Sequence, residues 1–135
     1  MSKLRQKSDF NISAADALLQ KNLYAPSVHC SYYSCFQLLK YTIKEFFGED
    51  YEAQAVNIAA SQQKTHQHVV NYVSNELKGL AGIEESRKFK RTIKDLKQFR
   101  TESDYENVEV NSDKGNNAYT KANEIRSYII KNFKV

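Results

Sequence analysis

The residues best suited to chemistry in this chain are an arginine and an aspartate one helical turn apart, Arg100 and Asp104, followed by Tyr105. Arg100 continues the apolar side of its predicted helix, which carries Phe89, Ile93 and Leu96. Its guanidinium therefore points towards the core or a cleft, where Asp104 at i+4 can be its anionic partner. The pattern has two interpretations: a helix-end salt bridge that fixes the packing of two helices, or a cleft arginine that binds a phosphate.

Five cations lie on the opposite, exposed face of the same helix: Arg87, Lys90, Arg91, Lys94 and Lys97. Such a stripe would neutralise phosphates and give salt-dependent binding if a nucleic acid were the ligand. Four acidic residues interrupt it, namely Glu84, Glu85, Asp95 and Glu102. The alternative is therefore an ordinary solvated helix face.

The histidines and cysteines do not have the spacing of a metal site. His66 and His68 are two residues apart, whereas two ligands on one helix need a spacing of three or four. Cys30 and Cys35 are separated by about 7.5 Å along a helix and roughly 140° around it, so they cannot pair with each other. No Gly-rich phosphate loop, serine-hydrolase elbow or paired-carboxylate motif is present. We predict no metal, no cofactor and two thiols that serve packing.

Length and composition predict one helical domain over residues 1–135. The chain has 1 Pro and 4 Gly, too few for a fold with many tight turns, and 41% hydrophobic residues exclude a disordered tail. A net charge of +4 permits an anionic partner without requiring one. The charged N-terminus has no apolar run behind it, so we expect no signal peptide and no membrane association. Together with the free thiols, this favours the cytoplasm.

Apolar periodicity predicts an all-α, antiparallel up-and-down bundle of four to five helices. The expected elements are a short helix capped by Ser13 and ending at Lys21 and Asn22, a long helix from Ala25 and Pro26 to Gly48, a helix capped by Thr65 that ends at Gly79 and Gly82, a helix over 84–104, and a final helix from Ala118 to Phe133. Residues 49–64 form either a short helix or an ordered loop, and residues 107–117 form a loop. We expect no strands.

The long helix is apolar over more than one face. Its main stripe contains Val28, Tyr32, Cys35, Phe36, Leu39, Ile43 and Phe46, and a flanking stripe contains His29, Tyr33, Phe36, Lys40 and Phe47. A helix of this kind lies at the centre of a bundle or at a subunit contact. This breadth also predicts a homodimer.

Three segments resemble the HEPN domain family. Residues 24–36, with a small residue, the pair Tyr32 and Tyr33, and then Phe36, resemble the signature second helix of these domains. Lys64-Thr65-His66 resembles the Ser/Thr-His segment of the family, and the run from Leu96 to Arg100 followed by Asp104 and Tyr105 resembles its Arg-xxx-Asp-Tyr segment. The resemblance covers residues 13–133.

The resemblance implies an antiparallel helical bundle, commonly dimeric, that works with RNA or nucleotides. Such domains often accompany a nucleotidyltransferase or another protein partner and occur in toxin-antitoxin and defence systems. The family-signature and interface candidates here are His29, Tyr32, Tyr33, Phe36 and Tyr105.

The resemblance also implies which residues catalysis would need. Many HEPN domains are metal-independent ribonucleases, and these have a histidine four to six residues after the motif arginine. Arg100 matches the arginine, but residues 101–107 contain no histidine. RNA cleavage without a metal needs a group that exchanges protons near neutral pH, which imidazole supplies. We therefore predict a non-catalytic domain that binds RNA, a nucleotide or a partner protein. The alternatives are a ribonuclease that uses Arg100 with His66 or Asp104, and a structural or antitoxin-like interaction module.

Overall fold

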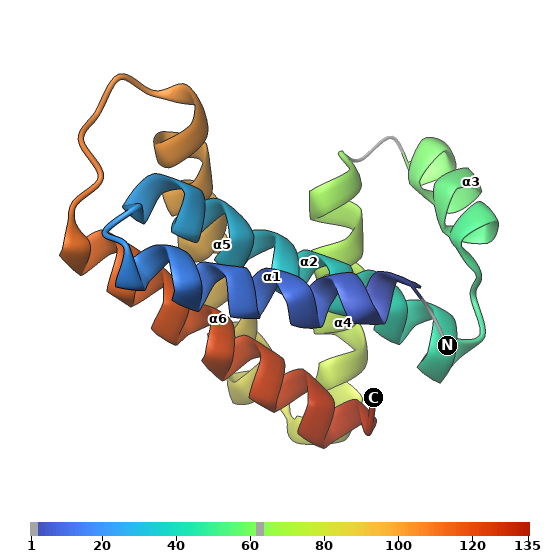
Figure 1. The fold of residues 1–135 in the computed structure, drawn as a ribbon. Helices are drawn as coiled ribbons and strands as arrows, with labels where there is room; N and C mark the ends of the chain where they lie inside the picture. The colour runs from blue at the N-terminus through green and yellow to red at the C-terminus, as the bar shows by residue number, and fades with distance from the viewer. Residues whose placement is uncertain (1–2, 62–63) are drawn as a thin grey trace.

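The computed structural model describes residues 3–61 and 64–135, and these residues form six α-helices and no strand (Figure 1). The helices are α1 (Lys3–Gln20), α2 (Tyr24–Phe47), α3 (Tyr51–Ser61), α4 (Thr65–Ala81), α5 (Ile83–Tyr105) and α6 (Ser112–Phe133). The predicted all-α bundle is confirmed. The helix beyond the five expected is α3, so the helical alternative for residues 49–64 is the correct one. Residues 62 and 63 of that stretch, like residues 1 and 2, lie outside the described residues.

The long helix α2 lies at the centre of the bundle, where it packs against α1, α4, α5 and α6. It ends as predicted at Gly48, whose φ of 71° is a left-handed conformation that glycine adopts without a steric penalty. Figure 1 shows α1 and α6 alongside it and α3 standing apart from the bundle. The broad apolar surface of α2 is therefore covered mainly by helices of the same chain. Of the two positions expected for this helix, the centre of the bundle and a subunit contact, the structure shows the first.

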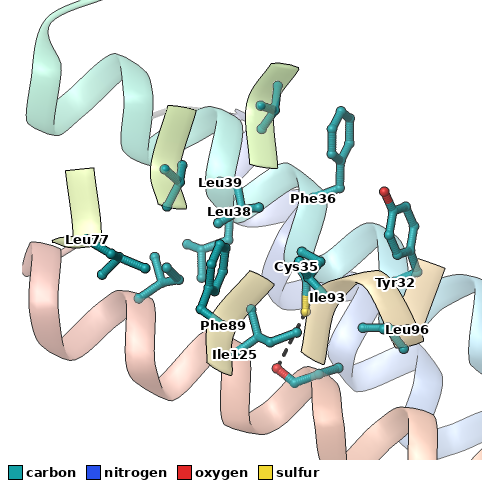
Figure 2. Close-up of a cluster of buried hydrophobic side chains, with 14 of the residues drawn as sticks. Tyr32, Cys35, Phe36, Leu38, Leu39, Leu77, Phe89, Ile93, Leu96 and Ile125 are labelled. Atoms are coloured by element: carbon teal, nitrogen blue, oxygen red, sulfur yellow. Dashed lines mark hydrogen bonds between the residues drawn. The ribbon is translucent and has the colours of Figure 1, made fainter. Parts of the chain in front are cut away.

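The hydrophobic core consists of side chains from four helices, α2, α4, α5 and α6 (Figure 2). Leu39, Leu77, Ile93 and Ile129 are almost completely buried in it. Burial of one such side chain stabilises the fold by about 1.5–3 kcal/mol. Tyr32 lies at one end of the cluster, opposite Leu77, and its ring is buried while its hydroxyl points away from the aliphatic side chains (Figure 2).

The thiol of Cys35 belongs to this core. Its Sγ lies 3.5 Å from the carbonyl oxygen of Ala122 on α6, and burial raises the pKa of Cys35 to about 12. Cys30 and Cys35 are both free. The prediction that they do not pair with each other is confirmed.

The predicted start of the first helix at Ser13 is wrong, because α1 begins ten residues earlier, at Lys3. The missed turns carry few apolar residues and pack through hydrogen bonds instead. Ser8 Oγ donates to the carbonyl oxygen of Ser34 at 2.6 Å, and Ser34 Oγ donates to that of Ser8 at 2.7 Å. Arg126 of α6 completes this buried contact by donating to both hydroxyls. Apolar periodicity cannot detect a helix face of this kind.

Two other predicted boundaries need correction. Thr65 does not cap α4, since the N-cap is Lys64 and no side chain there accepts a capping hydrogen bond. The loop predicted over residues 107–117 is shorter, because α6 begins at Ser112, where the Asn111 side chain accepts from the backbone N–H of Lys114 at 2.9 Å. Within the described ranges, no helix combines the length and apolarity needed to cross a membrane.

Candidate functional site

Arg100 is held near the end of α5 by three aromatic rings. Its guanidinium carbon lies 5.3 Å from the ring centre of Tyr32, 5.5 Å from that of Tyr33 and 5.5 Å from that of Tyr105. Nη1 also donates to the hydroxyl of Tyr105 at 3.3 Å. The residue is only 7% exposed, so its contact with the buried ring of Tyr32 forms away from bulk water, where a cation–π contact is strongest. Arg100 therefore points towards α2, as its place on the apolar side of α5 predicted.

Asp104 is the carboxylate of this site, and it has two partners. One oxygen lies 3.8 Å from Nη1 of Arg100 and 2.7 Å from Nδ1 of His29 on α2. The salt bridge predicted along α5 is thus present but long, and the closer contact joins two helices. The Nε of Arg100 is buried without a hydrogen-bond partner in the part of the chain described. A single shared carboxylate leaves the positive charge of Arg100 only partly balanced.

His66, in the first turn of α4, lies against the other aromatic residues of α2. Its ring is nearly parallel to Phe36, with centroids 4.3 Å apart, and to Tyr32, with centroids 5.4 Å apart. Its Nδ1 forms a hydrogen bond with the Tyr32 hydroxyl. Burial, followed by the positive charges of Lys97 and Arg100, lowers the pKa of His66 to about 4, so the imidazole is neutral at pH 7. Burial raises the pKa of Tyr32, which keeps the phenol protonated.

A basic pocket of about 330 Å³ opens beside these rings between α4 and α5. Four lysines and no acidic residue are among the described residues that line it: Tyr32, Lys64, His66, Gln67, Val70, Asn71, Lys90, Ile93, Lys94 and Lys97. Burial, followed by the positive charges of Arg100 and Lys64, lowers the pKa of Lys97. The pocket therefore concentrates positive charge without a matching carboxylate.

A family model described as the HEPN domain matches residues 1–133, which is almost the whole chain. The chain belongs to the HEPN domain family. No curated protein and no solved structure matches it. In this HEPN domain the three segments that carry the sequence resemblance meet at one place: the Tyr32–Tyr33 pair, His66 and the segment from Arg100 to Tyr105 all adjoin the basic pocket or the Arg100 cluster.

The five cations predicted as one stripe have different surroundings in this HEPN domain. Lys90, Lys94 and Lys97 line the pocket. Arg87 and Arg91 are exposed and are not among its lining residues, and Arg87 lies 3.9 Å from Glu84. The α5 face thus divides into a pocket side and a solvated side.

Two residues that the sequence analysis placed only in segments resembling the family, Lys64 and His29, make contacts in the site that it did not predict. Lys64 joins the lysines of α5 because the first turn of α4 packs beside that helix, and His29 meets Asp104 because α2 and α5 run antiparallel. His29 carried one usable clue, its place on the stripe that also holds Tyr33, since the two rings lie 4.7 Å apart.

Metal binding and thiol chemistry find little support at this site. Within residues 3–61 and 64–135, no three His, Cys, Asp or Glu side chains gather closely enough to hold a metal ion. Burial and the negative charge of Asp104 raise the pKa of Cys30, the nearest thiol, so it is protonated at neutral pH and is a poor nucleophile.

Proposed function

We propose that this HEPN domain binds the phosphates of RNA or of a nucleotide in the basic pocket between α4 and α5. The observation that carries the proposal is the set of four lysines, Lys64, Lys90, Lys94 and Lys97, around a pocket whose described lining contains no carboxylate. Burial, and after it the like charges of neighbouring cations, disfavours the charged form of Lys97 and lowers its pKa. A bound phosphate would remove that repulsion.

The first turn of α4 supports the same proposal. A helix N-terminus has backbone N–H groups without helical partners and a partial positive charge, both of which favour an anion. At α4 the side chain of the N-cap residue, Lys64, does not cap these groups. Gln67 and Asn71, one turn apart on α4, add neutral hydrogen-bonding side chains to the pocket wall.

RNA is the ligand that the surrounding aromatic residues favour. Tyr105 is 75% exposed at the end of α5, and its ring lies next to the Arg100 guanidinium. Unpaired bases stack on exposed aromatic rings, each with about 1–3 kcal/mol of binding free energy. An RNA strand with phosphates in the pocket would reach Tyr105 by following α5 from Lys97, a rise of about 12 Å over eight residues.

Homodimerisation is part of the proposal and rests on the family. Since α2 is covered by its own chain, the second copy would contact the rim of the site where His29 and Tyr33 lie, rather than the core stripe. Light scattering at micromolar concentration tests this, and a monomeric mass would contradict it. A cytoplasmic location, a nucleotidyltransferase partner and a toxin-antitoxin or defence role stay predictions.

Fluorescence anisotropy with a labelled single-stranded RNA tests the binding site. We expect the double variant Lys94→Ala/Lys97→Ala to bind at least tenfold more weakly at low salt. The slope of log K against log salt should shrink by about 1.4, since each cation contributes roughly 0.7 for a single strand. Lys88→Ala is the matched control, because Lys88 lies on the same helix and lines a separate pocket with α6.

Two outcomes would contradict the proposal. The first is that neither RNA nor a nucleotide binds to the protein at low ionic strength. The second is that Lys88→Ala weakens RNA binding as much as the loss of one pocket lysine does. Tight association with a neighbouring gene's product, without any affinity for nucleic acid, would instead favour the interaction-module alternative.

A further inference from the structure

Helix α3 presents an apolar face to solvent. Its exposed residues at i, i+3, i+4, i+7 and i+8 are Glu52, Ala55, Val56, Ala59 and Ala60, and we call them the α3 stripe. Val56 is 67% exposed, and Glu52 is the one charged residue of the helix. An apolar stripe with this spacing normally packs against another element. Figure 1 shows α3 standing apart from the bundle, and no described part of the chain covers the stripe.

The opposite face of α3 is attached to the bundle. The Gln54 side chain is buried, and its Nε2 donates to the carbonyl oxygen of Lys40 at 3.1 Å and to that of Glu49 at 2.9 Å. Ile58, one turn later, packs against the core. These contacts fix which side of α3 faces inwards, so the α3 stripe is held outwards.

An apolar pocket of about 300 Å³ opens between α5 and α6, and we call it the α5–α6 pocket. Phe89 and Ile125 contribute to its apolar lining, and each is only 3% exposed. The lining lies within residues 85–92 of α5 and 124–131 of α6, about 10 Å along each helix. The α3 stripe, over residues 52–60, is about 12 Å long. The pocket and the stripe therefore have similar lengths.

Charged residues of both signs surround the α5–α6 pocket. Because α5 and α6 run antiparallel, residues early in α5 lie beside residues late in α6. Lys88 and Lys131 therefore lie towards one end of the pocket, together with Glu85. Glu124 lies at the other end, beside Thr92. One end thus carries a net positive charge and the other a negative charge.

We propose that the α5–α6 pocket binds the α3 stripe of a second copy of this chain. Val56 would enter the pocket and pack against Phe89 and Ile125. Both surfaces are apolar along their centres and open to solvent in the single chain. Their contact would remove this apolar surface from water, which favours association.

The charges determine the direction in which α3 would lie. Glu52 is in the first turn of α3, ahead of the apolar residues of the stripe. In one direction it faces Lys88 and Lys131, and in the reverse direction it faces Glu124. Opposite charges across an interface favour one arrangement over another. The first turn of α3 would therefore lie at the end of the pocket where α5 begins and α6 ends.

The size of the contact predicts a weak, reversible association. Helix α3 has 11 residues and the pocket is about two turns long, whereas stable interfaces bury about 1,200–2,000 Å² in total. Reciprocal exchange of α3 between two copies would double the buried area. The contact leaves the basic pocket and the rim at His29 and Tyr33 uncovered, so this inference goes beyond the proposed function and does not depend on it.

Sedimentation velocity on the full chain, from about 10 µM to 1 mM, tests for this contact. We expect the mean mass to rise over this range, beyond any dimer that forms through the rim. Val56→Asp would place a charge in the apolar pocket and should raise the dissociation constant at least tenfold. Phe10→Asp is the matched control, because Phe10 is an apolar residue of α1 with a similar exposure of 70%. It should associate as the wild type does.

An exchange of charges identifies the two surfaces that meet. Glu52→Lys and the double variant Lys88→Glu/Lys131→Glu should each associate more weakly than the wild type, because like charges then face each other. In an equimolar mixture each α3 can meet a pocket of opposite charge, so association should return to the wild-type level. All the changed residues are exposed, and equal thermal unfolding midpoints would show that the variants are folded.

Three results would overturn the inference. The first is a mass that stays constant up to 1 mM, and the second is equal weakening by Phe10→Asp and Val56→Asp. The third is a mixture of the charge variants that associates no better than either variant alone. The RNA-binding experiment is separate, since none of these variants changes Lys64, Lys94 or Lys97. Failure of RNA binding would therefore count against the proposed function alone.

Discussion

The guanidinium of Arg100 and the ring of Tyr32 lie 5.3 Å apart, although the two residues are on different helices. The same ring is nearly parallel to His66, and its hydroxyl bonds to the imidazole. Tyr32 thereby connects the first turn of α4 with the end of α5. Because the buried Tyr32 ring contacts both Arg100 and the neutral imidazole of His66, it fixes the spacing of these two groups beside the basic pocket.

His66 gives the first prediction, which concerns pH. Its pKa of about 4 in the folded chain lies below the ordinary value of 6.5, so between these pH values the unfolded chain binds a proton that the folded chain does not. Stability contributed by the neutral His66 is therefore present above about pH 6.5 and is lost as the pH falls towards 4. Urea unfolding at pH 7 and pH 5 should show a smaller acid-induced loss for His66→Gln than for the wild type.

His68→Gln is the control for this experiment, because it removes a histidine from the same helix. An NMR titration of the ring protons gives an independent reading, and a midpoint for His66 near 6.5 would contradict the prediction.

Lys97 gives the second prediction, in which function and stability change in opposite directions. Burial and the nearby cations disfavour its charged form, so Lys97→Met keeps the length of the side chain and removes repulsion. We expect a Tm equal to that of the wild type or higher by at most a few degrees, together with weaker RNA binding. Thermal unfolding and anisotropy on the same protein measure both. A clear fall in Tm would show that Lys97 stabilises the fold instead.

The sequence predicted those features that depend on neighbouring residues in the chain, and it did not predict contacts between residues far apart in the sequence. The stripe of Val28, Tyr32 and Leu39 and the stop at Gly48 are local features, and they correctly predicted the central helix α2. Arg100 was found because it continues a local apolar pattern on α5. The contact between His29 and Asp104 spans 75 residues and depends on how α2 packs against α5, which no local pattern encodes.

The start of α1 shows the same limit within the fold. Its first turns hold no apolar stripe, because their packing depends on hydrogen bonds among Ser8, Ser34 and Arg126. The partners in this cluster lie as many as 118 residues apart. A helix segment whose buried contacts are made by hydroxyls and one guanidinium therefore has the polar sequence of an exposed segment.

Arg126 gives the third prediction. Its guanidinium is buried, donates to Ser34 Oγ at 3.0 Å and to Asp9 at 2.7 Å, and contacts Ser8. Arg126→Ala leaves buried hydroxyls and a carboxylate without this partner, and we expect it to lower the free energy of unfolding by about 2–4 kcal/mol. Chemical denaturation measures the change. Arg87→Ala, at an exposed arginine, should stay within about 0.5 kcal/mol of the wild type, and an equally small effect at Arg126 would contradict the structure.

Two helical glycines give the last prediction, because the same substitution should act differently at each. A Cβ added at Gly79 in α4 meets nothing within 4 Å, so Gly79→Ala should stabilise the protein by about 0.5–1 kcal/mol through helix propensity alone. At Gly115 in α6, a Cβ would lie 3.0 Å from Leu19 Cδ2, 3.1 Å from Tyr24 Cδ1 and 3.3 Å from Tyr24 Cβ. Because this contact joins α6 to the ends of α1 and α2, Gly115→Ala should be at least 1 kcal/mol less stable than Gly79→Ala. Equal unfolding free energies for the two variants would mean that α6 does not approach Leu19 and Tyr24 this closely.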